Sequence, residues 1–258
     1  MENQTNRINI DLNKFADQLY GEISSDLKTL QIINDAVKLE NYSTTCYTLT
    51  QGSLTSTVSV PPIEFLKQRE LNKCFKSIIS SLQDYMDKLI AIHRLGGEDI
   101  IPPSGSKIED VGILLQSKFA ELLLKVSSDL TLNIPKKLEI LLVNHKNEEI
   151  KVSVQSYFDV RNGLEHHKGI AMKDRLITYK RIAVASTVGY EVIPPVTLGV
   201  GEGLILKTFS ETVAYDKGGN LIITRYQLNG IILNLLMFVI PTMLEEAVSK
   251  LNERRSIL

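Results

Sequence analysis

Long amphipathic helices are predicted over most of the first half of the chain, because apolar residues recur there every three or four positions. The first is expected over about residues 11–40, and the second over about 62–94, after Pro61-Pro62, which favour a helix start. A third is expected over about 107–128, where Ser106 and Glu109 have the spacing of a capping box. The apolar positions of the first helix are Leu12, Phe15, Leu19, Ile23, Leu27 and Leu30.

The segments between and after these helices are less uniform. Residues 41–60 are rich in Ser and Thr, and their pattern leaves open a loop or a short pair of strands. Residues 134–143 are apolar, but at this length the period does not distinguish a helix from a strand. Two further helices are expected over about 148–167 and over about 225–254, each with apolar residues on its core side.

The stretch over about 175–223 has a different pattern, in which β-branched and aromatic runs alternate with Gly and Pro. Residues 216–220, Asp-Lys-Gly-Gly-Asn, predict a turn, and residues 199–203 predict a hairpin turn. The glycines of 199–203 lack the Lys-Ser/Thr of a phosphate-binding loop. The expected strands are 176–179, 182–185, 190–193, 204–206 and 221–223. The fold class is therefore predicted as mainly α, a single domain over 1–258 in which a helical bundle carries a β-rich insertion before the last helix.

Composition narrows the class of protein without identifying its function. The 258 residues are 43% hydrophobic and 23% charged, with a net charge of −1. These values are ordinary for a globular protein, and they exclude a strong overall field that attracts nucleic acid. The apolar run 231–240 is too short to span a bilayer and ends at Pro241, so burial in a core or an interface is expected. With no secretory signal pattern and no metal-like cysteine spacing, we expect a cytoplasmic protein without a membrane segment.

The densest chemistry lies at the end of the helix expected over 148–167, in the sequence Arg-Asn-Gly-Leu-Glu-His-His at 161–167. Asn162 and His166 are four residues apart and share a helix face, and the long side chain of Arg161 can reach the same region. A guanidinium, an amide and an imidazole together suit a phosphodiester next to a ribose hydroxyl. The imidazole can exchange the hydroxyl proton, and the guanidinium can hold the phosphate oxygens.

The residues Arg161, Asn162 and His166, preceded by an aromatic and aliphatic helix, resemble the motif of HEPN domains (higher eukaryote and prokaryote nucleotide-binding). In that family an Arg and a polar residue are followed by a His after four to six intervening residues. His166 satisfies the spacing with four and His167 with five, so either could be the equivalent. The resemblance implies a small helical domain, usually dimeric, whose two motifs face each other. Many members are metal-independent endoribonucleases of toxin or antiviral defence systems, and others bind nucleotides or act as scaffolds.

The resemblance assigns catalytic roles to Arg161, Asn162 and His166 and phosphate contacts to His167 and Lys168. It implies RNA as the substrate, a homodimer, and an antitoxin or defence-system partner. No cofactor is expected, and no carboxylate and His cluster has the spacing of metal ligands. Two other interpretations stay open. The chain could be an inactive module that binds a nucleotide or a protein through its final helix, or the Arg and His could only complement a helix end that Lys168-Gly169 cap.

Overall fold

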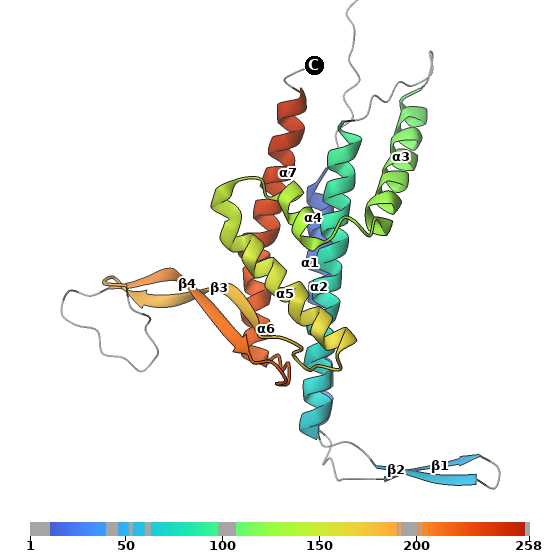
Figure 1. The fold of residues 1–258 in the computed structure, drawn as a ribbon, viewed down its shortest axis with the longest axis vertical. Helices are drawn as coiled ribbons and strands as arrows, with labels where there is room; N and C mark the ends of the chain where they lie inside the picture. The colour runs from blue at the N-terminus through green and yellow to red at the C-terminus, as the bar shows by residue number, and fades with distance from the viewer. Residues whose placement is uncertain are drawn as a thin grey trace, which may run out of the picture. The chain divides into compact units, whose positions relative to one another are not determined.

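The computed structural model describes residues 11–39, 46–51, 54–59, 63–97, 107–189, 191, 201 and 203–255. These residues are mainly helical and contain two separate two-stranded antiparallel sheets (Figure 1). They divide into two compact units. The first unit comprises Met1–Tyr20, Ser80–Phe158 and Leu233–Leu258, and the second comprises Gly21–Ile79 and Asp159–Ile232.

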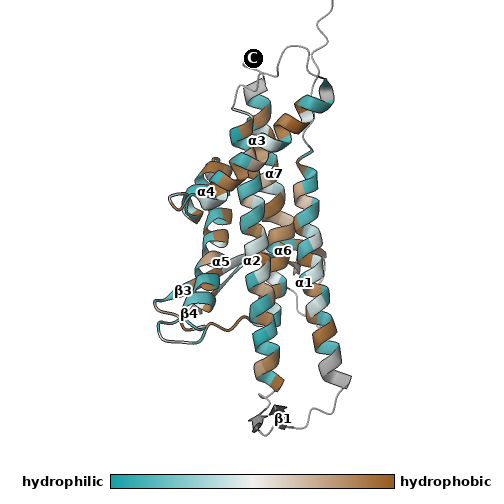
Figure 2. Cartoon of the chain, turned by 90° about the vertical axis from the view of Figure 1, so that its right-hand side faces the viewer, coloured by the Kyte–Doolittle hydropathy of each residue, from teal (hydrophilic) through white to brown (hydrophobic). Residues whose placement is uncertain are grey.

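The helices lie close to the ranges expected from the apolar period, and polar and apolar residues alternate along them (Figure 2). Four of them, α1, α2, α5 and α6, contain residues of both units. The last expected helix is observed as three consecutive segments, the middle one being a π-helix. The elements are α1 Asn13–Leu39, α2 Ile63–Leu95, α3 Ile108–Ser128, α4 Ile134–Leu141, the 3₁₀ turn η1 His145–Asn147, α5 Glu148–His166, α6 Arg225–Asn234, the π-helix η2 Leu235–Val239 and α7 Ile240–Arg255.

Both segments that the apolar pattern left undecided have regular structure. Residues 134–141 form helix α4, because the Asn133 side chain accepts the Lys136 N–H (3.2 Å) and Pro135 lies in the first turn. The Ser/Thr-rich segment forms an antiparallel hairpin of β1 Cys46–Gln51 and β2 Leu54–Ser59. At the start of α3, the Asp110 carboxylate accepts the Lys107 N–H, while the predicted cap Ser106 lies outside the described residues.

The described part of the β-rich insertion forms one long hairpin where several short strands were expected. β3 Arg175–Ser186 pairs antiparallel with β4 Leu204–Tyr215 over 12 residues, from Arg175 opposite Tyr215 to Ser186 opposite Leu204. Figure 1 shows the two strands as a ribbon beside α6. The strand expected at 221–223 is absent, because Leu221 there pairs with the end of α5 instead. Of the predicted strand 190–193 and turn 199–203, only Glu191, Gly201 and Gly203 are described.

The core of the first unit is built from α2, α5, η2 and α7. Two polar pairs lie inside it. Asn234 Nδ2 donates to the Tyr157 hydroxyl (2.8 Å), and Lys137 of α4 forms an ion pair with Asp87 of α2 (2.5 Å). These four polar groups therefore have partners, as burial requires, whereas the buried Tyr85 hydroxyl has no hydrogen-bond partner. The largest buried apolar side chains are Leu82, Tyr85, Met86, Leu89, Ile90, Val154, Tyr157, Phe158, Leu235, Val239, Ile240 and Met243.

The second unit has its own buried side chains, contributed by α1, α2, α5, the long hairpin and α6. They are Ile23, Leu30, Phe75, Ile78, Ile79, Val160, Ile177, Tyr179, Leu221, Ile223, Leu228 and Ile231. Gly230 of α6 lies against Tyr179 of β3 so closely that an added Cβ would stand 2.4 Å from the ring. The absence of a side chain at position 230 therefore lets the hairpin and α6 pack in direct contact.

The final helical run is longer than its apolar centre indicates. Residues Arg225–Glu253 form the one stretch among the described residues that is long and apolar enough to cross a membrane by length and composition. The expectation of too short a span concerned residues 231–240 alone, and the helix that contains them is longer. In its most apolar window 44% of the residues are buried inside the protein, including Leu235 and Val239.

Candidate functional site

The predicted motif lies at the C-terminal end of α5, and all its residues belong to the second unit. Arg161 is partly buried, whereas Asn162, His166, His167 and Lys168 are exposed. His166 is the last residue of α5, one helical turn after Asn162, so the two side chains leave the helix from the same face. The amide and the imidazole are therefore accessible together at one helix end.

The chain leaves the helix through a left-handed turn directly after the histidines. Lys168 and Gly169 have φ angles of 53° and 78°, and the N–H groups of His167 and Gly169 both donate to the Gly163 carbonyl. This arrangement confirms the interpretation of Lys168-Gly169 as a helix cap. Lys168 is the one residue other than Gly with a positive φ in the described part of the chain, and this conformation is unfavourable for a residue with a Cβ. His167 and Lys168 consequently follow the helix and do not share its last-turn face with Asn162.

The base of the long hairpin holds the helix end in place. Ala171, which follows the left-handed turn, is hydrogen-bonded to the hairpin base through its backbone. Its N–H donates to Gly219 O (2.9 Å), and its carbonyl accepts the Gly218 N–H (2.7 Å). Leu221 N–H donates to Gly169 O (2.7 Å). The predicted turn at 216–220 is confirmed. We call the backbone hydrogen bonds between residues 169–171 and 218–221 the motif seam. It fixes the backbone immediately after the histidines.

Gly163, inside the motif, is a packing position. A Cβ there would lie 2.4 Å from Leu221 Cδ1 and 3.6 Å from Arg175 Nε. Leu221 is 2% exposed, and the Arg175 side chain crosses the same helix to donate to the Asp159 carbonyl. Gly163 therefore admits the hairpin base onto α5, at the cost of about 1 kcal/mol of intrinsic helix propensity.

Arg161 has a carboxylate partner on its own helix. Its Nη2 lies 3.4 Å from Glu165 Oε2, and the two side chains are 20% and 29% exposed. Between residues 161 and 175 the cations are Arg161, Lys168, Lys173 and Arg175, and the anions are Glu165 and Asp174. Four cations against two anions give a local excess of positive charge, in a chain whose net charge is −1. This is an excess along the sequence, and one of its cations, Arg175, is already hydrogen-bonded to the Asp159 carbonyl.

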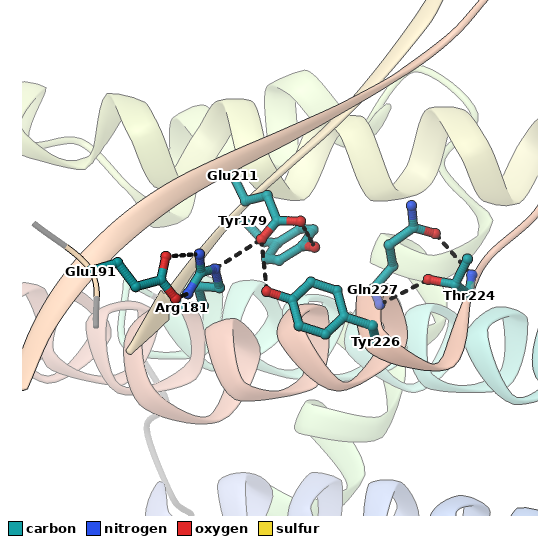
Figure 3. A network of polar contacts seen from close by, with 7 residues as sticks. All are labelled: Tyr179, Arg181, Glu191, Glu211, Thr224, Tyr226 and Gln227. Atoms are coloured by element: carbon teal, nitrogen blue, oxygen red, sulfur yellow. Dashed lines mark hydrogen bonds and ion pairs between the residues drawn. The ribbon is translucent and has the colours of Figure 1, made fainter. Parts of the chain in front are cut away.

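A second polar cluster, not foreseen from the sequence, ties the long hairpin to α6 (Figure 3). Arg181 of β3 binds Glu191 through both terminal nitrogens (2.6 and 2.5 Å) and Glu211 of β4 through Nε (2.8 Å). Glu211 also accepts the hydroxyls of Tyr179 and Tyr226. The hydrogen bonds from Arg181 lower the pKa of Glu191, whereas burial, followed by Glu211, raises the pKa of Tyr179. Since every charged member is paired, we assign this cluster a structural role.

Two hollows in the described surface are lined by residues outside the motif. One, of about 220 Å³, is lined by α1 and α2 side chains including Asp26, Lys73 and Cys74. Burial raises the pKa of the Cys74 thiol to about 12, which makes it a poor nucleophile at neutral pH. The other, of about 490 Å³, lies between residues 143–147 and α7. Among the described residues, no group of three or more His, Cys, Asp and Glu side chains is placed to hold a metal ion.

Comparisons of the chain with protein-family models, with curated proteins and with solved structures find no match.

Proposed function

We propose that this chain is an endoribonuclease of the HEPN type, acting on RNA as a homodimer without a metal ion. The observation that carries the proposal is the placement of Asn162 and His166 on one exposed face at the end of α5, with Arg161 beside them. The motif seam holds this helix end and leaves those side chains accessible. The exposed cations Lys168 and Lys173, which follow this helix end, support an anionic substrate.

In the proposed reaction the imidazole of His166 accepts the proton of a ribose 2′-hydroxyl. The 2′-oxygen attacks the adjacent phosphorus, the bond from phosphorus to the 5′-oxygen breaks, and a proton donor returns a proton to that leaving oxygen. The products are a 2′,3′-cyclic phosphate and a 5′-hydroxyl. Arg161 stabilises the negative charge that gathers on the phosphate oxygens, and Asn162 orients the phosphate. His167 and Lys168 add contacts to neighbouring phosphates.

The histidine of one motif can act as a general acid or as a general base, whereas the reaction needs one of each. A second copy of the motif across a two-fold axis would provide the second imidazole and a second guanidinium, since a two-fold interface presents the same patch from both subunits. Of the two histidines, His166 is our choice for the catalytic one, because it shares the α5 face of Asn162 and His167 does not.

The test is incubation of the purified protein with labelled single-stranded RNA in EDTA. We expect cleavage that falls by at least about 100-fold in Arg161→Ala and in His166→Ala, as for loss of a proton-transfer group. Matched controls are His93→Ala and Arg94→Ala, which remove the same residue types from the C-terminal turn of α2. Unchanged cleavage in the motif variants, or no cleavage with any RNA tested, would contradict the proposal.

A second candidate function is a catalytically silent module that binds a protein partner, such as an antitoxin or a defence-system component. The observation that favours it is a set of exposed apolar side chains along the final helical run: Leu233 at the end of α6, Met237 of η2 and Val248 of α7 are 45%, 50% and 41% exposed. Met237→Glu would then abolish partner binding and leave any RNA cleavage unchanged. If Met237→Glu instead abolishes homodimer formation, this face is the interface between copies.

A further inference from the structure

Glu165 has no role in the proposed reaction, although it forms an ion pair with Arg161, the residue proposed to bind phosphate. Its Oε2 is 3.4 Å from Arg161 Nη2. Hydrogen bonds between a guanidinium and a carboxylate normally measure about 2.7–2.9 Å, so this contact is loose. Both side chains reach solvent, at 20% and 29% exposure, and another anion can approach the guanidinium.

The ion pair contributes little to the stability of α5. On a helix, a carboxylate one turn before a cation is the favourable order, and here the cation comes first. Glu165 also lies in the last turn, where the helix dipole disfavours a negative charge. Exposed pairs of this kind stabilise proteins weakly in any case. Helix stability therefore does not explain a carboxylate at position 165.

We propose that Glu165 is a positioning residue that competes with the substrate phosphate for Arg161. In the unbound protein the carboxylate holds the guanidinium at the surface, and on RNA binding a phosphate oxygen replaces Glu165 at Nη2. This inference rests on the proposed function, because it assumes that Arg161 binds an RNA phosphate. Its consequence is that Glu165 weakens the binding of anions to Arg161. An anion binds the guanidinium only when its affinity is high enough to displace the carboxylate.

The experiment measures binding without cleavage. A fluorescein-labelled 12-nucleotide 2′-O-methyl RNA of mixed sequence is titrated in EDTA and followed by fluorescence anisotropy. Glu165→Gln should lower the dissociation constant by about two- to fivefold, the effect expected for removal of one competing surface charge. In an Arg161→Ala background the same substitution should change it by less than about 1.5-fold, because the competition has lost its target. The matched control is Glu148→Gln, which removes an exposed carboxylate from the first turn of the same helix.

Each outcome separates this inference from the proposed function. Tighter binding in Glu165→Gln that disappears without Arg161 supports both. Unchanged or weaker binding in Glu165→Gln, with weaker binding in Arg161→Ala, overturns the inference and leaves the proposed function standing. Equal tightening in Glu165→Gln and Glu148→Gln also overturns it, because net charge alone then explains the effect. If the unaltered protein does not bind RNA saturably, and Arg161→Ala changes nothing, the proposed function and the inference fail together.

Discussion

Gly163 shows how a single position can serve packing inside a motif that otherwise carries charge. It lies between Asn162 and Leu164 in α5, where Ala would be the better helix former. The buried Leu221 side chain occupies the space that a Cβ would need. The position therefore reports on the contact between α5 and the hairpin base, independently of any RNA chemistry.

Gly163→Ala should destabilise the protein by about 1–3 kcal/mol, because Leu221 must move from a filled site. The measurement is urea unfolding followed by circular dichroism. Gly112→Ala in α3 is the matched control, since nothing lies within 4 Å of a Cβ there, and we expect it to stabilise by about 0.5–1 kcal/mol. Equal effects at the two positions would show that Leu221 does not pack as described.

At the scale of residues, the sequence predicts which side chains share a helix face, but not which residues contact each other across the fold. The helical spacing of Asn162 and His166 and the cap at Lys168-Gly169 follow from local rules, and the structure has both. The contact of Gly163 with Leu221 joins residues 58 positions apart, so no local pattern could reveal it. The catalytic roles of the motif residues stay predictions.

At the scale of elements, α4 and α2 of the first unit are joined by a buried charge pair. Lys137 and Asp87 have side chains only 4% exposed and lie 2.5 Å apart. Burial raises the pKa of Asp87 in spite of the neighbouring lysine, whose hydrogen bond and charge act in the opposite direction. Desolvation is thus the larger effect, which means that the carboxylate depends on Lys137 to remain charged.

Lys137→Met should lower the free energy of unfolding by about 3–5 kcal/mol at pH 7, because it leaves a buried carboxylate without its cation. The double variant Asp87→Leu with Lys137→Met should recover most of this loss, since neither charge is then buried. Urea unfolding of the two single variants and the double variant measures the coupling. Additive losses in the double variant would rule out a specific pair.

The long helices were predictable from apolar period, whereas the extent of the hairpin was not. Lys180 and Arg181 break the apolar pattern of 176–185 and indicated two short strands. The strand continues through them, because Arg181 is neutralised by Glu211 and Glu191. Glu211 faces Tyr179 across the ladder and Glu191 follows a bend, so both partners come from outside the local window.

At the scale of the whole molecule, burial of ionisable groups predicts sensitivity to alkaline pH. Burial raises the pKa of the Cys74 thiol from 9.0 to about 12 and that of the Tyr215 hydroxyl from 10.0 to about 12. Above pH 9 the unfolded chain loses these protons first and the folded chain retains them. Deprotonation therefore favours the unfolded state, and the stability present below pH 9 is lost as the pH rises toward 12.

The contribution of Cys74 can be isolated by comparing the parent protein with Cys74→Ala between pH 8 and pH 10.5. At pH 8 the variant should be less stable by about 1 kcal/mol, the typical loss for a substitution. The difference should narrow as the pH rises, by up to about 1.4 kcal/mol for each unit above the unfolded pKa, and should change sign before pH 10.5. A difference that stays constant across the range would exclude a raised thiol pKa.

The motif seam also limits how the protein can be shortened. The Leu221 side chain packs on Gly163, and the Leu221 N–H donates to the Gly169 carbonyl. Leu221 lies in a segment that follows the whole hairpin. A truncation that stops anywhere before Leu221 would strip the last turn of α5 of its cover and fray it, even with every motif residue retained. The same fragment would lack α6, η2 and α7, so its loss of activity would report missing packing, not a missing catalytic residue.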